Sequence, residues 1–317
     1  MTQPEAKPIV PNASNVQNAS NVPNAPSVLN RPSLPNAPNV PVLMYHHISP
    51  AGGMICTTPQ HFNDQLAALK GAGYSSLTAT QFADYLAGGT VPEKSVLITF
   101  DDGYLNNWVY AHPLLQRHGM NAILFAVTSW IGTGPCRPFF DPQSQMELPP
   151  CPDHAACKAA IENGQADSVM ARWEELNAML RAGTFEVFSH THTHTRWDKV
   201  WAQDPRAKKN RIAEELLASQ QALKKHLGVD APHLCWPQGY FDADYLDAAH
   251  TAGFKYLYTT DPWGQNKPFN DPAHIFRFAV RNKNGSWLLR RVGLTRHPRF
   301  GPWYHAFKAW KKKRRNA

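Results

Sequence analysis

Short apolar runs alternate with longer segments of helical spacing along most of this chain. Residues 96–100 are apolar or β-branched and too few for a helix, which predicts a buried strand. Further strands are predicted at residues 40–48, 121–127, 185–189, 233–236, 255–259 and 275–280, and helices at 59–72, 81–86 (capped by Thr80), 108–118, 168–182, 206–227 and 244–252. This alternation indicates parallel β-α-β units and about seven strands, which suits a closed or incomplete (β/α) barrel.

The two ends of the chain differ from this alternating middle. Residues 1–39 repeat short words such as Asn-Ala-Ser-Asn-Val and contain almost no aromatic or large apolar side chains. Such a segment cannot bury enough surface to offset its ordering entropy, so we predict a disordered tail. We place one folded domain at residues 40–300 and a basic aromatic tail at residues 301–317.

The C-terminal tail has the pattern of a helix that lies on a surface. Trp303, Phe307 and Trp310 fall on one helical face, and the basic run 311–315 follows them. This combination favours an anionic membrane, where each basic residue adds about 1 kcal/mol. A solvated tail or a nucleic-acid contact would use the same charges. We favour peripheral contact with the membrane and expect no nucleic-acid partner.

Composition narrows the class of protein and its compartment. With 317 residues, 43% hydrophobic and 18% charged, the chain can bury one large core or two smaller ones. No apolar run approaches the roughly 18 residues that cross a bilayer, and the N-terminus lacks the pattern of a secretory signal. Five cysteines are an odd number and too sparse for a disulfide scaffold. We therefore expect a cytoplasmic protein, held by its basic tail at the inner face of the membrane.

Residues 133–167 interrupt the alternation of strands and helices. This segment contains Cys136, Cys151, His154 and Cys157, which could hold a structural zinc ion as a second metal. It has no Cys-x-x-Cys pair, and the first spacing between its cysteines is long. We favour an irregular insertion beside a substrate cleft, because long loops in compact domains are often functional.

Polar clusters follow the predicted strands at the point where each strand ends. They are His46-His47, Asp101-Asp102, His190 to His194, and Pro237-Gln238-Gly239. The carboxyl ends of parallel strands gather at one end of a (β/α) barrel, where the chemistry of such barrels takes place. We therefore expect these side chains to form one site.

The histidines and carboxylates have the composition of a metal site. His190 and His194 are four residues apart, so on one helical turn both imidazoles can bind the same ion. If the segment is extended, His192 competes as a ligand. Two imidazoles with one carboxylate suit zinc and leave positions open for water and substrate. One of Asp101 and Asp102 would bind the ion, and the other would act as a base.

Three motifs in this order resemble the polysaccharide deacetylases of the NodB-homology type, carbohydrate esterase family 4. They are Thr99-Phe-Asp-Asp-Gly103, His190-Thr-x-x-His194 and Pro237-x-Gly239, and the opening Pro41-Val-Leu-Met-Tyr-His46 also looks like the first strand of many members. The resemblance covers residues 40–297. It implies a distorted (β/α)7 barrel that removes N-acetyl groups from a glycan with one divalent metal ion, Zn²⁺ or else Co²⁺, Ni²⁺ or Mn²⁺.

The resemblance also implies a role for each matching residue. Asp101 matches the catalytic base, and the loop 237–239 matches the one whose backbone N–H polarises the acetyl carbonyl as an oxyanion donor. The late motif Leu294-Thr-Arg-His297 implies that His297 is the general acid, whereas His46 could line the pocket. The metal ligands that the resemblance implies are Asp102, His190 and His194.

Two elements depart from the family pattern. The family's Arg-x-Pro-Tyr reads Cys235-Trp-Pro-Gln238 here, so the arginine that orients the base is missing. Arg277 or Arg281, from another strand, is the candidate replacement. The family's Asp-x-x-x-Trp element is at best Asp261-Pro-Trp263, with a different spacing.

These observations predict a metal-dependent sugar N-deacetylase with an N-acetylated glycan as its substrate. The basic tail favours a lipid-linked sugar or an amino sugar of a lipopolysaccharide core. Hydrolysis of another acyl ester or amide on the same site is an alternative, and a catalytically silent glycan-binding barrel is another. The adjacent Asp101 and Asp102 favour catalysis, because binding alone needs no spare base.

Overall fold

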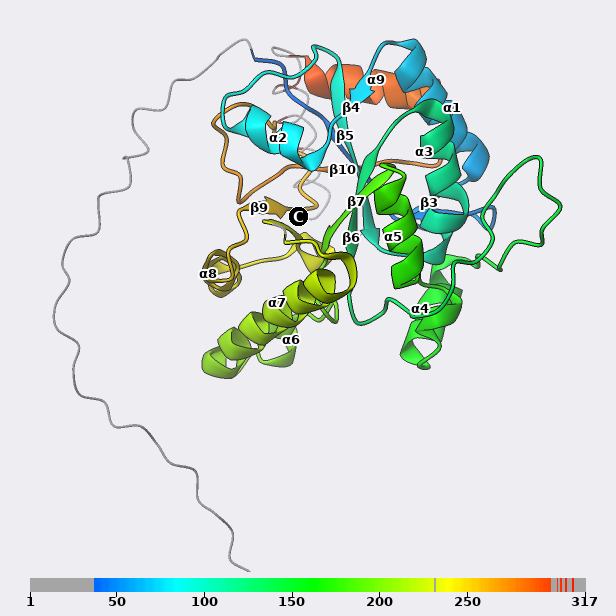
Figure 1. Cartoon of the computed structure of the whole chain (residues 1–317). Coiled ribbons are helices and arrows are strands. Elements are labelled where there is room, and N and C mark those ends of the chain that lie inside the picture. Colours follow the sequence, from blue (N-terminus) through cyan, green and yellow to red (C-terminus); the bar gives the residue numbers. More distant parts are fainter. Residues whose placement is uncertain are drawn as a thin grey trace, which may run out of the picture. The chain divides into compact units, whose positions relative to one another are not determined.

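The main sheet of the protein is parallel and curled. A computed structural model describes residues 37–230 and 232–297, together with residues 301, 303, 306 and 310. The strand order is β10-β1-β5-β6-β7-β8-β9. The bounds are β1 Val42–Tyr45, β5 Ser95–Asp102, β6 Ala122–Ala126, β7 Phe185–Ser189, β8 His233–Cys235, β9 Tyr256–Tyr258 and β10 Phe278–Ala279. A bridge between Tyr258 and Ile275 joins β9 to the segment before β10, which confirms the predicted distorted (β/α)7 barrel (Figure 1).

Short strands and helices complete the fold around this sheet (Figure 1). The strand β4 Ser75–Ser76 pairs with β5, and β2 His47–Ile48 pairs with β3 Cys56–Thr57. The helices are α1 Pro59–Gly71, α2 Ala79–Leu86, the π-turn η2 Asn107–Ala111, α3 His112–His118, α4 His154–Glu162, the 3-10 turn η3 Ala166–Ser168, α5 Trp173–Arg181, α6 Trp197–Val200, α7 Pro205–Leu227, the 3-10 turn η4 Pro237–Gly239, α8 Ala243–Thr251 and α9 Gly285–Arg296.

Three predicted helices differ from the structure in their bounds. Thr78 rather than Thr80 caps α2, because its side chain accepts from Gln81 N–H in a capping box. The helix predicted at 168–182 begins only at Trp173, since Val169 and Met170 bond to the segment after β5 instead. The helix predicted at 108–118 is split into η2 and α3.

Side chains of β5 alternate between two buried layers. Ile98 and Phe100 pack outward with residues of α1 and α5, and both are fully buried. Leu97 points to the other face, where Phe125 and Tyr258 also pack. Burial of each such side chain contributes roughly 1.5–3 kcal/mol. Asp101 follows Leu97 and Thr99 at the two-residue period of a strand, so the inner layer leads directly to the predicted site.

Some predictions concern residues that the structure does not describe. The described residues do not include residues 1–36 of the disordered tail predicted at 1–39. They do not include the basic run 311–315 either. Both, and the domain bounds drawn from them, stay predictions. No helix of the described part of the chain is long and apolar enough to cross a membrane.

Candidate active site

Asp101 and Asp102 end β5 and both line one pocket. Adjacent residues of a regular strand point to opposite faces. Asp102 has a φ of 73°, in the left-handed region that non-glycine residues seldom adopt, and Gly103 follows with a φ of 91°. This turn breaks the alternation of the strand and brings both carboxylates to the same side. Such strain is typical of functional sites.

Asp102, His190 and His194 form the group that fits a metal ion. Asp102 Oδ1 lies 3.4 Å from His190 Nε2 and 3.7 Å from His194 Nε2. One ligand atom from each of the three residues lies within 4.8 Å of the other two. Burial alone would raise the pKa of the Asp102 carboxyl, but the imidazoles of His190 and His194 hold it below its ordinary value. Burial lowers the pKa of His194 to about 4, which keeps its imidazole neutral and able to ligate.

The two histidines come together in an irregular loop and not on the helical turn that their spacing predicted. Thr191 and His194 have φ values of 67° and 61°. Buried Glu215 of α7 accepts from the backbone N–H groups of His192 and Thr193 and holds the loop in this shape. The Nδ1 of His192 contacts Thr128 Oγ1 at 2.9 Å, and His192 is absent from the group, so its candidacy as a ligand was wrong.

Arg277 takes the place of the missing base-orienting arginine. Its Nη1 and Nη2 donate to the two carboxylate oxygens of Asp101 at 2.7 and 2.8 Å. Burial alone would raise the pKa of the Asp101 carboxyl, but the Arg277 guanidinium holds it below its ordinary value. Arg277 also donates to Thr259 O at 2.8 Å. Of the two candidates, Arg281 lies elsewhere and lines a second cavity.

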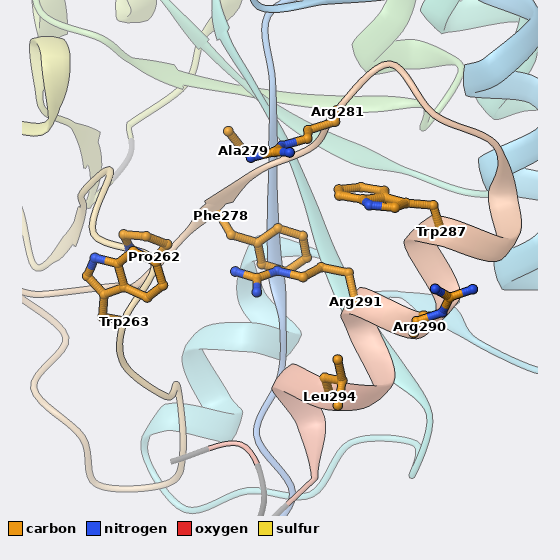
Figure 2. A pocket seen from close by; sticks show the side chains of 9 residues that line it. All are labelled: Pro262, Trp263, Phe278, Ala279, Arg281, Trp287, Arg290, Arg291 and Leu294. Carbon is orange, nitrogen blue, oxygen red and sulfur yellow. The ribbon is translucent and has the colours of Figure 1, made fainter. Parts of the chain in front are cut away.

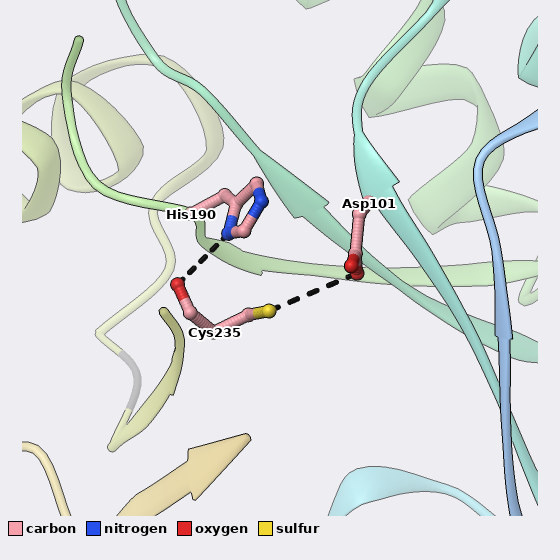
Figure 3. A group of neighbouring side chains, drawn as sticks. All are labelled: Asp101, His190 and Cys235. Atoms are coloured by element: carbon pink, nitrogen blue, oxygen red, sulfur yellow. Dashed lines mark hydrogen bonds between the residues drawn. The ribbon is translucent and has the colours of Figure 1, made fainter. Parts of the chain in front are cut away.

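Asp101, His190 and Cys235 form a second compact group (Figure 3). The Cys235 thiol lies 3.8 Å from Asp101 Oδ1 but 2.9 Å from Arg277 Nη2. A metal ion among these side chains would meet the permanent charge of the guanidinium. Burial raises the pKa of the Cys235 thiol, which disfavours the thiolate that a metal requires. This group therefore holds Asp101 and His190 in place and is not a metal site.

The backbone of Cys235 fixes the tautomer of His190. His190 Nδ1 lies 2.8 Å from Cys235 O, as the dashed line in Figure 3 marks. A carbonyl accepts only, so Nδ1 is the donor to it, and Nε2 is the nitrogen that faces Asp102 and is placed to bind an ion. Such a bond to the outer nitrogen is typical of metal-ligating histidines. The donor set and its surroundings thus fit a divalent ion.

The pocket has a volume of about 370 Å³. It is lined by His46, Ile55, Asp101, Asp102, Tyr104, Trp130, His154, Lys158, Ile161, Glu162, His190, His194, Gln238 and Thr260. His46 Nε2 lies 3.8 Å from Asp101 Oδ2, so His46 lines the pocket as predicted. Gln238 reaches it with a left-handed φ of 56° between Pro237 and Gly239.

The structure does not bring His297 to this pocket. His297 follows the last turn of α9, where Thr295 O accepts from Asn39 before the start of β1. The pocket lies past the other end of β1, at His46. The seven residues of extended chain from Asn39 to His46 span about 23 Å, so His297 lies at the opposite end of β1 from the pocket. The prediction of His297 as general acid was therefore wrong in its placement, because a short motif carries no information on the barrel end it occupies.

The insertion 133–167 supplies one wall of the pocket, as the sequence predicted. Its helix α4 contributes His154, Lys158, Ile161 and Glu162. Sequence reasoning missed this helix, although Asp153 is a recognisable N-cap. His154 Nδ1 contacts His47 Nε2 at 3.2 Å, and no metal group of the described residues combines it with the cysteines. The alternative of a zinc site in this insertion is not supported.

A buried ion pair anchors the insertion to the barrel. Arg137 donates to Glu175 Oε1 through Nε at 2.8 Å and to Oε2 through Nη2 at 2.8 Å. Its other N–H groups donate to Asp167 O and Met170 O, both at 2.7 Å. The Glu175 side chain is fully buried. Arg137 therefore holds the two ends of the insertion together beside α5.

Fold and site together define a (β/α) barrel with a candidate metal-binding group at the ends of its strands. The model of the polysaccharide deacetylase family matches residues 88–257, more than half of the 317-residue chain. The chain therefore belongs to the polysaccharide deacetylase family, whose members are enzymes.

Individual relatives support this family and its fold. The chain is 24% identical over 231 residues to the poly-β-1,6-N-acetyl-D-glucosamine N-deacetylase of Staphylococcus aureus (strain MSSA476), with 73% of this chain and 69% of the relative covered. YxkH of Bacillus subtilis is 40% identical over 93 residues, 29% of this chain, and the match spans only a third (33%) of YxkH. The structure of IcaB from Ammonifex degensii shares the fold with a TM-score of 0.62 and 23% identity, covering 80% of this chain and 97% of IcaB.

Proposed function

We propose that this enzyme is a metal-dependent N-deacetylase that hydrolyses the acetamido group of N-acetylglucosamine units in a glycan. The observation that carries the proposal is Asp101, held by Arg277, beside the group of Asp102, His190 and His194 in one pocket. The Staphylococcus relative, named for a polymer of N-acetylglucosamine, supports the choice of sugar. An acidic group kept ionised next to a cation site is what amide hydrolysis by an activated water requires.

Asp102, His190 and His194 would hold the divalent ion, and their two imidazoles with one carboxylate favour Zn²⁺ over Co²⁺, Ni²⁺ or Mn²⁺. Such an ion polarises an acyl carbonyl and lowers the pKa of water toward about 7. Asp101 is the base that accepts the proton of the attacking water. The two hydrogen bonds from Arg277 keep its carboxylate ionised and oriented.

We assign the general acid to His46 in place of His297. His46 lines the pocket 3.8 Å from Asp101 Oδ2, with 18% of its side chain exposed. From this position its Nε2 can donate a proton to the amine that leaves as the acetamide C–N bond breaks. The backbone N–H of Gln238 is the proposed oxyanion donor, because this residue reaches the pocket from a turn with a left-handed φ of 56°. Gly239 permits the turn, since a Cβ there would lie 2.6 Å from Thr260 N.

Acetate release from N-acetylglucosamine oligomers tests the proposal with wild type, chelated protein and two variants. We expect chelation to abolish turnover and Zn²⁺ to restore it. Asp101→Asn should lower kcat by about 10²–10⁴-fold and retain bound metal. His192→Gln is the matched control in the same loop and should retain both metal and activity.

Full activity of Asp101→Asn would refute the assignment of the base. Release of acetate from acetyl esters but not from the oligomers would indicate the alternative function, hydrolysis of another acyl ester or amide on the same site. Glycan binding without any turnover in the metal-loaded protein would identify a silent glycan-binding barrel.

We further propose that the protein works at an anionic membrane surface on a lipid-linked or lipopolysaccharide-core sugar. Trp303 and Trp310 are 68% and 52% exposed, and the run 311–315 places five basic residues after them. Exposed tryptophans beside positive charge favour interfacial binding. Removal of residues 311–315 should weaken sedimentation with anionic vesicles. Equal sedimentation with and without them would contradict the proposal, and a cytoplasmic location stays a prediction.

A further inference from the structure

A second cavity lies between α9, β10 and the loop that contains Trp263, outside the catalytic pocket. Its volume is about 410 Å³, and none of its lining residues lines the catalytic pocket. Figure 2 shows the residues that line it: Pro262, Trp263, Phe278, Ala279, Arg281, Trp287, Arg290, Arg291 and Leu294. A cavity of this size is sufficient for a small ligand.

The charge of this cavity has one sign. Arg281, Arg290 and Arg291 line it, and no acidic side chain of the described residues does so. The exposed guanidinium groups of Arg281 and Arg290 attract an anion that enters the cavity. The guanidinium of Arg291 lies 4.9 Å from the centre of the Phe278 ring, which fixes one of the three charges against an apolar wall.

The remaining walls are aromatic. Trp263 and Trp287 lie at opposite sides of the cavity, with Phe278 and Arg291 between them (Figure 2). The backbone N–H of Trp263 donates to Asp261 Oδ1 at 2.9 Å, and this bond closes the turn that carries Trp263. Indole rings offer flat faces for an apolar chain or a sugar ring. These walls, together with the positive charge, suit a molecule that combines an anionic group with an apolar or sugar part.

The two sites meet at β10 and at the loop before it. Arg277 points into the barrel and holds Asp101, whereas Phe278, the next residue, faces the second cavity. Thr260 lines the catalytic pocket, and Pro262 lines the second cavity two residues later. The cavity thus lies on the outer side of β10, whose first residue follows the base-orienting arginine directly.

We propose that this cavity binds a phosphate ester attached to an apolar or sugar moiety. The arginines that line the cavity carry the charge that complements a phosphate, and a guanidinium fork donates paired hydrogen bonds to phosphate oxygens. Trp263 and Trp287 cover the moiety that carries the phosphate. The site is independent of the deacetylase chemistry, so its test needs no turnover.

The test is calorimetric titration of the full chain with inorganic phosphate and with glycerol 1-phosphate, and sedimentation with vesicles of phosphatidylglycerol in phosphatidylcholine. Arg281→Ala/Arg290→Ala removes two exposed charges of the cavity. Arg117→Ala/Arg206→Ala is the matched control, because it removes two exposed charges from α3 and α7. Arg281→Lys/Arg290→Lys retains the charge but loses the planar fork.

We expect the alanine pair to weaken phosphate-ester binding by about tenfold or more, the lysine pair by less, and the control by under about twofold. Loss confined to the soluble phosphates identifies a soluble ester, and loss that extends to the vesicles identifies a lipid headgroup. The proposal is overturned by no binding in any arm, by equal loss in the control, or by glucuronate binding as tightly as glycerol 1-phosphate.

Discussion

Arg277 donates two parallel hydrogen bonds to Asp101, at 2.7 and 2.8 Å, across 176 residues of sequence. Both side chains are buried, with 0% and 3% of their surface exposed. The family pattern has an arginine next to the proline-glycine loop, at the sequence position where this chain has Cys235. In this chain Arg277, the residue directly before β10, supplies the guanidinium beside the base.

Arg277→Met should destabilise the protein by about 3–5 kcal/mol, because it leaves the buried Asp101 carboxylate without a partner. Urea unfolding measures this change in the free energy of unfolding. The double variant Arg277→Met/Asp101→Asn removes both charges and should cost less than Arg277→Met alone. Arg281→Met, exposed in the structure, is the control and should stay within about 0.5 kcal/mol of wild type. A double variant as unstable as the sum of its parts would contradict this account.

Substitution of each candidate general acid in turn distinguishes the assignment made from the sequence, His297, from the one made from the structure, His46. His46→Asn should lower kcat by about 10²-fold or more, since it removes the proton donor proposed for the leaving amine. His297→Asn should leave kcat within about twofold, because His297 lies outside the pocket. Steady-state acetate release measures both. A large loss in His297→Asn with normal activity in His46→Asn would restore the original assignment.

Arg137→Met should affect substrate binding through the insertion wall. The substitution leaves buried Glu175 unpaired, which costs about 3–5 kcal/mol of stability. It also releases the insertion, which contains α4, from its anchor on the barrel. We expect KM for oligomers to rise while kcat stays near its wild-type value, because Lys158 and Ile161 of α4 line the pocket but belong neither to the metal group nor to the Asp101–Arg277 pair. Arg181→Met, on the exposed end of α5, is the control. An unchanged KM would show that α4 does not contact the substrate.

The burial of His112 leads us to predict that the free energy of unfolding falls in weak acid. It stacks on Trp108 and bonds to Thr184 Oγ1 at 2.7 Å, and burial lowers its pKa to about 4. Its unfolded pKa is near 6.5, so the unfolded chain binds the extra proton first as the pH falls. The stability from neutral His112 is therefore present above about pH 6.5 and declines toward pH 4, by at most about 1.4 kcal/mol per pH unit.

His112→Gln tests this origin, because glutamine bonds to Thr184 without titrating. The variant should show a shallower fall of the free energy of unfolding between pH 6.5 and 4 than wild type does. Parallel curves for the two proteins would assign the acid sensitivity to other groups.

The sequence by itself determined the barrel, the family and the carboxylates and imidazoles at the centre of the pocket. Asp101, Asp102, His190 and His194 were identified because each follows a strand, and the strand ends of a parallel barrel meet at one place. This inference needs only local pattern and the topology that the pattern dictates. The inference predicted that His190 and His194 belong to the site. It did not predict the conformation of their loop, which depends on Glu215 of a distant helix.

Only the tertiary structure decided which partners these residues have. Arg277, and not Arg281, bonds to Asp101. His46, and not His297, lines the pocket, and α4 of the insertion forms one of its walls. Such contacts join residues far apart in the chain, and two arginines or two histidines look alike in sequence. Which one is inside depends on strand alternation and on the end of the barrel it occupies, and both are set by packing of the whole domain.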